Sequence, residues 1–348
     1  MERYALNLKK RNFFSEKYAT VPSRWRFGVK NRSFVRFSPG KGVPKTIFCP
    51  WWPRLLHNLG FKHFQAEFPD DRACLEKIMQ IQYGGTQFVC PHCKVISKFH
   101  QLSKRRAFSC DHCGYHIYPC VGTPFERSRT KLTHWFFALY LMTSTRHGVA
   151  AKELERQIGC TYKTAWRMAH ELRKLMAQAD NHASLSGHVE IDETLIGGQQ
   201  TREDTKKKGT NKTIVMGMVE RNGILRAGPI KDVKTETLES IVVKNVDIGS
   251  TVSTDEWPGY NSLDLAYQHG RVNHHSKEYV NGEHHVNSLE GHWSLLKRSI
   301  KGTHVHVSGK HLWKYVSEFS YRHNMRKSHY AMFHQLVASF SLPRLVES

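Results

Sequence analysis

The sequence lacks any long hydrophobic stretch. Its longest apolar run covers residues 135–142 and is far too short to cross a bilayer, which takes roughly 20 residues. The basic N-terminal region is not followed by the apolar core of a secretory signal either. These two absences argue against a membrane-spanning or secreted protein and predict a soluble, cytoplasmic one.

Acidic residues are also scarce. The 348 residues include 30 Asp and Glu against 52 Lys and Arg, which gives a formal net charge of +22 at pH 7. Such an excess of positive charge indicates a polyanionic partner, most often a nucleic acid. Charge alone does not distinguish DNA, RNA and an anionic membrane surface.

No internal repeat is visible, and the length allows two or three domains with at least one sizeable core. Residues 1–60 contain thirteen Lys and Arg against two Glu, with no sustained period of 2 or 3.6. No fold is predicted for this extension. It is either a disordered basic arm on nucleic acid or an extension with no role of its own.

Eight cysteines are present, and four of them form two Cys-x-x-Cys pairs on either side of a basic stretch that can form a hairpin. Zinc prefers four soft ligands in a tetrahedron, so this spacing predicts a zinc ribbon rather than disulfides, with four unrelated buried thiols as the alternative. The predicted ligands of a structural Zn²⁺ are Cys90, Cys93, Cys110 and Cys113. Because four thiolates complete such a site, the neighbouring His92, His112 and Cys120 are predicted not to be ligands.

A helical period follows the cysteines, and two further helices are predicted over "AAKELERQIG" and "TYKTAWRMAHELRKLM". Gly159 supplies a tight turn between them and Thr161 a cap for the second helix. This is the spacing of a helix-turn-helix, which would direct Tyr162, Lys163 and Arg167 toward a DNA major groove. An ordinary helical hairpin in a core is the alternative.

After these helices, the first segment whose pattern predicts a β-strand is "HVEIDETLIGG". Two further strands, 213–220 and 224–230, are joined by Asn222-Gly223, a strong hairpin signal. "TETLESIVVKNV" predicts a helix, "STVSTDEW" a strand and "GRVNHHSKEYV" a weaker strand. The last predicted helices cover residues 288–300 and 309–325.

Three acids stand in positions that need an explanation. Asp192 lies in the middle of a strand, where a carboxylate is disfavoured and costly to bury without a partner. Asp255 ends another strand, and strand ends are where α/β sheets usually place their chemistry. Glu290 shares a helix face with Lys297, an arrangement suited to Mg²⁺ and a phosphodiester. However, Asn287-x-x-Glu290 is also close to a capping box, so Glu290 could serve only as a cap.

Neighbouring residues offer rival assignments. Glu193 and Glu256 adjoin the two aspartates, but on a strand they would face the opposite way. Trp257 and Trp293 are interpreted as core residues. Two histidine pairs could bind a transition metal but are predicted to be surface or phosphate-facing groups, and these are His274-His275 and His284-His285.

Taken in order, the cysteine pairs, the helix-turn-helix, "VEIDETLIGG", "STDEWPGY" and "HVNSLEGHWSLLKRSIKGTHVHVS" resemble the insertion-sequence DDE transposases that carry an N-terminal zinc ribbon. The resemblance covers about residues 61–330. Asp192 and Asp255 are 63 residues apart (255 − 192), and Asp255 and Glu290 are 35 apart (290 − 255). The second spacing, with Lys297 seven residues further on, is similar to the spacing in that family.

The resemblance implies an α/β catalytic core of the ribonuclease-H-like type, a mixed sheet with flanking helices. Asp192, Asp255 and Glu290 would then bind two Mg²⁺ (or Mn²⁺) ions, and Lys297 and Arg298 would contact DNA. Some members use Asn or His as the third ligand, which makes Asn287 an alternative, but Glu290 keeps the seven-residue step to Lys297. The predicted segments are an extension (1–60), a zinc ribbon with its preceding helix (61–125), a helix-turn-helix (126–180), a catalytic domain (186–330) and a C-terminal tail (331–348).

The function implied is that of a transposase that binds transposon ends, cleaves their 3′ ends and joins them to target DNA. Its partners would be double-stranded DNA, both terminal inverted repeats and target, and further copies of itself in a dimer or larger assembly at the nucleoid. Two alternatives are a domesticated DNA-binding regulator without catalysis and a ribonuclease-H-like nuclease or junction resolvase.

Overall fold

A computed structural model describes residues 60–180, 184–197, 212–272, 282–328 and 331–342. The chain divides into two compact units, Met1–Pro53 and Arg54–Ser348, and every described residue belongs to the second. The basic extension up to residue 59 and the pair His274-His275 lie outside the described residues.

The described chain starts with two helices, α2 (Phe61–Glu67) and α3 (Asp71–Tyr83). The Asp70 carboxylate caps α3 by accepting the Ala73 amide at 2.8 Å. An antiparallel four-stranded sheet of order β1-β2-β3-β4 follows. Its strands are β1 (Gln87–Val89), β2 (Ile96–Gln101), β3 (Phe108–Cys110) and β4 (His116–Ile117).

Three helices come next, α4 (Leu132–Ser144), α5 (Ala151–Ile158) and α6 (Tyr162–Ala179). Gly159 ends α5 with a left-handed φ of 71°, a conformation that glycine adopts without steric cost. The Thr161 side chain then accepts the Thr164 amide at 3.4 Å at the start of α6. The predicted turn and cap are therefore both present.

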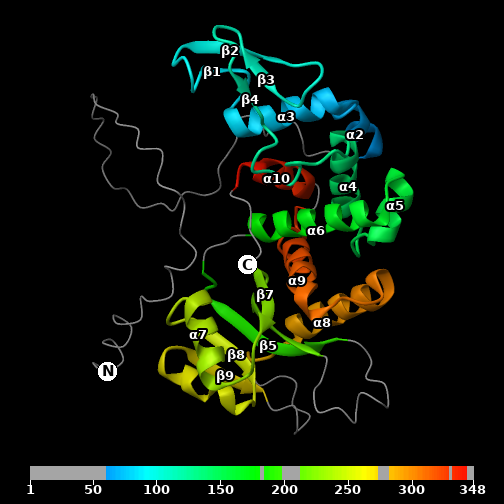
Figure 1. Cartoon of the computed structure of the whole chain (residues 1–348). Helices are drawn as coiled ribbons and strands as arrows, with labels where there is room; N and C mark the ends of the chain where they lie inside the picture. Colours follow the sequence, from blue (N-terminus) through cyan, green and yellow to red (C-terminus); the bar gives the residue numbers. More distant parts are fainter. Residues whose placement is uncertain (1–59, 181–183, 198–211, 273–281, 329–330, 343–348) are drawn as a thin grey trace, which may run out of the picture. The chain divides into compact units, whose positions relative to one another are not determined.

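A further helix, α10 (Met332–Ala338), follows the last helix that the sequence pattern predicts. Four of its side chains are buried in the core shared by α3, α4 and α6, and these are Met332, Phe333, Leu336 and Val337. In addition, the Gln82 side chain at the end of α3 donates to the Phe340 carbonyl at 2.7 Å. The segment expected as a tail thus supplies part of the core around the helices (Figure 1).

The second sheet has five strands in the order β7-β6-β5-β8-β9. Strands β5, β6 and β7 are antiparallel neighbours, whereas β8 pairs parallel with β5 and β9 parallel with β8. Asn222, with φ 58°, lies in the predicted hairpin between β6 and β7. The strands are β5 (His188–Ile196), β6 (Thr213–Glu220), β7 (Leu225–Ile230), β8 (Thr251–Asp255) and β9 (Gln268–Val272).

Helices cover both faces of this sheet (Figure 1). Helix α7 (Thr235–Asn245) and the 3-10 helix Pro258–Leu265 pack on the face that contains Val189 and Ile191 of β5. Helices α8 (Asn287–Ser299) and α9 (Gly309–Asn324) pack on the opposite face. Since side chains alternate along a strand, Glu190 and Asp192 belong to the face covered by α8.

A buried ion cluster holds α6 against α9. Arg173 of α6 donates to Glu318 of α9 at 2.7 Å, and Arg322 donates to the other carboxylate oxygen at 2.8 Å. Burial would raise the pKa of Glu318, but Arg173 and Arg322 outweigh it and lower the pKa to about 2. A charge buried with two partners is costly to leave unpaired, so the cluster fixes how the two helices pack.

No helix within the described ranges is both long and apolar enough to cross a membrane.

Candidate functional site

The two cysteine pairs occupy matching turns of the first sheet. After Cys90 the chain turns back so that the Lys94 amide donates to the Cys90 carbonyl at 3.0 Å, and the Gly114 amide donates to the Cys110 carbonyl at 2.9 Å. Lys94 (φ 62°) and Gly114 (φ 70°) both adopt left-handed backbone conformations. Each turn thereby directs two sulfur atoms to the same point.

The four sulfur atoms have the geometry of a zinc site. They lie within 4.8 Å of one another, with Cys90 Sγ 3.7 Å from Cys113 Sγ and Cys93 Sγ 4.0 Å from Cys110 Sγ. Sulfurs about 2.3 Å from one zinc ion are roughly 3.8 Å apart in a tetrahedron. The donor set therefore fits one structural Zn²⁺, and His92, His112 and Cys120 are not part of it.

The predicted aspartates lie on neighbouring parallel strands. Glu190 of β5 pairs with Ser253 of β8, so Asp192 and Asp255, each two residues further along, reach the same level of the sheet. Both are half-buried, and Asp255 is the last residue of its strand. Glu290 lies in the first turn of α8, on the face of the sheet toward which Asp192 points, and is exposed.

These three acids influence one another electrostatically. Burial raises the pKa of Asp192 to about 6; the indole N–H of Trp293 opposes the rise, and the carboxylates of Asp255 and Glu290 add to it. Among the described residues, the four cysteines are the one group of His, Cys, Asp or Glu side chains close enough together to hold a metal ion in common, so the acids are spread more widely. The structure thus brings Asp192, Asp255 and Glu290 into one negatively charged region without closing them into a tight cluster.

Glu193 is a further acid in the same region. Burial raises its pKa to about 8, and the charges of Asp255 and Asp192 act in the same direction. Its Oε1 atom is buried and has no hydrogen-bond partner within the described part of the chain. Burial and the two neighbouring carboxylates thus favour the protonated form of Glu193.

Glu290 is not the acid of a capping box. Val286, not Asn287, precedes the first helical residue, and its side chain makes no capping hydrogen bond. The fully buried Glu190 carboxylate replaces that cap by accepting the Ser288 amide and the Ser288 hydroxyl, each at 3.0 Å. The capping interpretation is therefore wrong, because the Glu that satisfies the helix start comes from β5.

The remaining residues near the acids differ from the sequence interpretation in two places. Trp257 is 46% exposed rather than in the core, and its indole donates to the Val233 carbonyl at 3.2 Å. His284 is half-buried against the sheet, with Nδ1 2.8 Å from the Ser253 hydroxyl, and His285 Nδ1 lies 3.3 Å from Glu190. These contacts attach the segment before α8 to β5 and β8.

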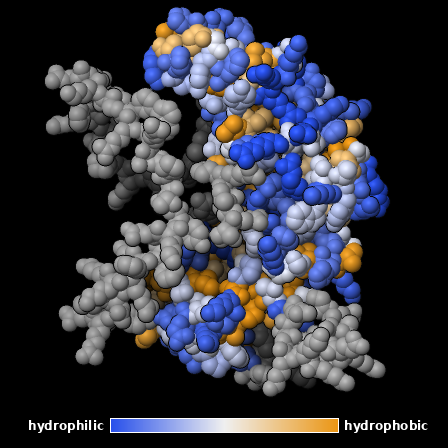
Figure 2. Space-filling view, in the orientation of Figure 1, coloured by the Kyte–Doolittle hydropathy of each residue, from blue (hydrophilic) through white to orange (hydrophobic). Residues whose placement is uncertain are grey.

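The predicted DNA-contacting residues are mostly accessible. Lys297 and Arg298 are exposed on α8, and Tyr162 and Lys163 are exposed at the start of α6. Arg167 differs, because it is half-buried and donates to the Ser128 hydroxyl at 3.1 Å. Figure 2 shows hydrophilic residues over much of the described surface in this view, with hydrophobic residues in several separate places, at the top and in the lower half. Val89 and Ile96 of the ribbon are exposed.

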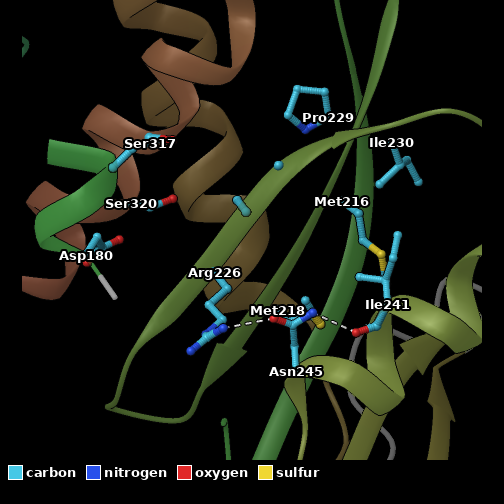
Figure 3. A pocket seen from close by; sticks show the side chains of 13 residues that line it. Asp180, Met216, Met218, Arg226, Pro229, Ile230, Ile241, Asn245, Ser317 and Ser320 are labelled. Atoms are coloured by element: carbon cyan, nitrogen blue, oxygen red, sulfur yellow. Dashed lines mark hydrogen bonds between the residues drawn. The ribbon is translucent and has the colours of Figure 1, made fainter. Parts of the chain in front are cut away.

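A cavity of about 370 Å³ lies elsewhere, beside the edge strand β7 (Figure 3). Met216 and Met218 of β6, Arg226 of β7 and Asn245 of α7 are among its lining residues, and Arg226 donates to the Asn245 side chain at 2.9 Å. None of the predicted catalytic acids lines it. The acids therefore lie outside this cavity, on β5, at the end of β8 and in the first turn of α8.

Comparison with known families supplies the deciding observation. Residues 184–324, which contain all three acids and Lys297, match a family described as the ISXO2-like transposase domain. Residues 69–116, which contain the four clustered cysteines, match the transposase zinc-ribbon domain. The chain belongs to the insertion-sequence transposases that carry an N-terminal zinc ribbon. In this transposase, both matched segments correspond to parts that the sequence pattern had singled out.

Two relatives agree with this placement. The transposase is 29% identical over 274 residues, 73% of its own length and 91% of the relative's, to an uncharacterized protein in transposable element ISH50 from Halobacterium salinarum. It is 28% identical over 111 residues, 31% of its length and 89% of the relative's, to an uncharacterized transposase-like protein from Haemophilus influenzae. No solved structure gives a significant match.

Two residues of the site were missed by sequence reasoning. The sequence pattern assigns Glu190 no role and Trp293 only to the core. A second acid two positions before Asp192 was the available signal for Glu190, since both would be buried on one face. Nothing in the local sequence distinguishes Trp293 from an ordinary core tryptophan.

Proposed function

We propose that this transposase binds the terminal inverted repeats of its element, cleaves their 3′ ends with the help of Mg²⁺ and joins them to target DNA. The observation that carries the proposal is the convergence of Asp192, Asp255 and Glu290 from two strands and a helix. Asp192 and Asp255 share one level of the sheet, and the charge of Glu290 acts on the pKa of Asp192.

The fold supports a ribonuclease-H-like assignment for the catalytic domain, residues 186–330. Three antiparallel strands continue into two parallel ones, and helices cover both faces. We assign residues 61–125 to the ribbon and 126–180 to a helix-turn-helix segment that binds DNA. Helix α10 joins the core of that helical segment, so the residues after 331 include a structural part of it.

The residues present fit a divalent metal of the hard, oxygen-loving kind. Carboxylate oxygens are the ligands that Mg²⁺ prefers, and the like charges around Asp192 are stabilised when a cation lies among them. Asp192, Asp255 and Glu290 would hold the ions. When bound, a pair of Mg²⁺ ions supplies Lewis-acid stabilisation of the attacking and leaving oxygens at phosphorus.

The basic side chains would hold the DNA backbone. Lys297 lies two helical turns beyond Glu290 and is exposed, so its ammonium group would contact a phosphate next to the acids. Arg298 would add a second contact, while Tyr162 and Lys163 at the start of α6 would contact the terminal repeat. Arg167 donates to the Ser128 hydroxyl, so it would help to orient α6. It would do so either in addition to a DNA contact or in place of one.

The proposed reaction has two displacements. In end cleavage, water forms a bond to phosphorus while the bond to the 3′ oxygen breaks and frees a 3′-hydroxyl. In joining, that hydroxyl attacks a target phosphodiester and the target's own 3′ oxygen leaves. Neither step forms a covalent bond to a protein side chain. The role of the acids would therefore be to hold the positively charged metal ions beside the reacting oxygens.

The test is incubation of the zinc-loaded protein with Mg²⁺ and duplexes that end in the element's terminal repeat. We expect cleavage at the repeat and joining to a target plasmid, and loss of both in Asp192→Asn and in Glu290→Gln without loss of repeat binding. Full activity in Glu290→Gln would exclude Glu290 as a ligand. Binding without cleavage would favour a regulator, and cleavage without joining would favour a nuclease.

A further inference from the structure

Trp293 connects α8 directly to the acid on β5. Its side chain is 4% exposed, and its indole N–H donates to Asp192 Oδ2 at 2.9 Å. Trp293 lies three residues after Glu290, so the two residues are neighbours on the helix surface. One helix therefore carries a proposed metal ligand and a hydrogen-bond donor to another.

Gly217 of β6 makes this contact possible. It pairs with Asp192 across the sheet, and a Cβ at this position would lie 2.6 Å from Trp293 Cζ2 and 2.7 Å from Cη2. Gly217 is not among the residues with positive φ, so backbone conformation does not require a glycine here. Instead, the space taken by the indole ring requires a glycine here, since a glycine within a strand often marks the close approach of another group.

A second link holds the same helix in place. Glu190, two residues before Asp192 on the same strand face, accepts the Ser288 amide and hydroxyl at the start of α8. Helix α8 is thus attached to β5 at two points that are one strand repeat apart. With its start fixed by Glu190, the helix has little freedom to move the indole away from Asp192.

We propose that Trp293 is a positioning residue for Asp192, and that Gly217 is required because it leaves room for the indole. This inference rests on the proposed function. The indole N–H can only donate, so it cannot bind a cation itself and instead occupies one acceptor position of Oδ2. The carboxylate is held in one orientation, and its remaining lone pairs stay available to the metal. Hydrogen bonds of this kind typically matter about 10- to 100-fold for metal affinity.

The experiment measures Mn²⁺ binding to the zinc-loaded, DNA-free protein by electron paramagnetic resonance of the free ion. Trp293→Phe keeps most of the packing and removes the donor, and we expect affinity to fall about 10- to 100-fold. Trp135→Phe is the matched control, because Trp135 is also buried and its indole donates to the Ser128 hydroxyl at 3.0 Å. Its Mn²⁺ affinity should equal that of the wild type.

A second pair of variants tests the same idea without touching the tryptophan. Gly217→Ala should displace the indole and weaken Mn²⁺ binding, whereas Gly228→Ala should not, since a Cβ at Gly228 meets nothing within 4 Å. The double variant Gly217→Ala with Trp293→Phe should bind no more weakly than the weaker single variant, because both act on one contact. Zinc content and thermal unfolding identify any variant that has lost its fold.

The possible outcomes distinguish a failure of this inference from a failure of the proposed function on which it rests. If folded Trp293→Phe and Gly217→Ala bind Mn²⁺ like the wild type, while Asp192→Asn loses binding and cleavage, Trp293 is only a core residue and the inference is overturned. If the wild type itself neither binds Mn²⁺ nor cleaves, the proposed function fails first. Weaker binding in both variants but in neither control supports the inference.

Discussion

Single residues decide the stability of the interface between α6 and α9, and Glu318 is the clearest case. Its carboxylate is completely buried between Arg173 and Arg322, which hold its pKa near 2 against an ordinary value of 4.5. Because the folded-state pKa is depressed, the stabilisation is complete above about pH 4.5 and is lost as the pH falls toward 2. Removing the charge leaves two guanidinium groups without their shared partner.

Glu318→Gln should therefore lower the free energy of unfolding at pH 7 by about 3–5 kcal/mol. The gap between variant and wild type should narrow once the pH falls below about 4.5, where the wild type starts to lose its own advantage. Chemical denaturation at pH 7 and pH 4 measures both values. Glu236→Gln, at an exposed position of α7, is the control, and an equal effect there would contradict the account.

At the scale of elements, the ribbon is held by its four thiolates. Cys113→Ser should abolish zinc binding and unfold the ribbon, because a structural zinc site contributes folding energy directly. Cys120→Ala should keep one zinc per chain, since Cys120 lies outside the cluster. Metal analysis by mass spectrometry checks both expectations, and zinc lost from Cys120→Ala would mean that the ligand set is wrong.

Helix α10 is the element that sequence reasoning missed, and its burial makes a second prediction at this scale. Leu336 is completely buried, whereas Leu342, beyond the helix, is 40% exposed. Leu336→Ala should cost about 2–5 kcal/mol of unfolding free energy. Leu342→Ala should change it by less than about 0.5 kcal/mol. Equal effects of the two substitutions on the free energy of unfolding would mean that the segment is a tail and not part of the core.

Most elements could be predicted because their signals are local. The Gly159 turn, the Thr161 cap and the hairpin at Asn222 each depend on a few neighbouring residues, and the structure contains all three. Helix α10 has only seven residues, and its core partners come from helices far away in the chain. A short apolar run of that kind carries no local sign of burial.

The same difference applies to the candidate site. Asp192 was identifiable because a carboxylate within a strand conflicts with local preference. Glu190 gives the same signal, as a second acid within that strand, but Trp293 gives none. Neither residue reveals its partner locally, since their hydrogen bonds join β5 to α8 across 98 and 101 residues of sequence. The sequence alone predicts which acids are candidates, whereas the packing of α8 on the sheet shows that Trp293 contacts Asp192 and that Glu190 contacts the start of α8.

For the whole molecule, the excess of positive charge predicts how DNA binding responds to salt. The formal net charge of +22 attracts DNA whatever the orientation of the protein. A contact by one particular lysine must therefore be distinguished from this general attraction. Lys297→Ala on α8 should weaken binding to the terminal repeat and reduce the salt slope by about one. Lys244→Ala on α7, which covers the opposite face of the sheet, should leave the slope unchanged.

A fluorescence-anisotropy titration over a range of salt concentrations measures these slopes. If both lysine variants reduce the slope equally, binding follows total charge rather than a DNA path along α8.

The central claim for the molecule is that two strands and a helix bring three distant acids to one divalent-metal site. The most direct measurement replaces the metal with Fe²⁺ in the zinc-loaded protein and maps where ascorbate and peroxide cleave the polypeptide. The account predicts cuts near residues 192, 255 and 290 together, all suppressed by excess Mg²⁺ and absent in Asp192→Asn. Cuts near only one of these positions, or cuts that Mg²⁺ does not suppress, would contradict it.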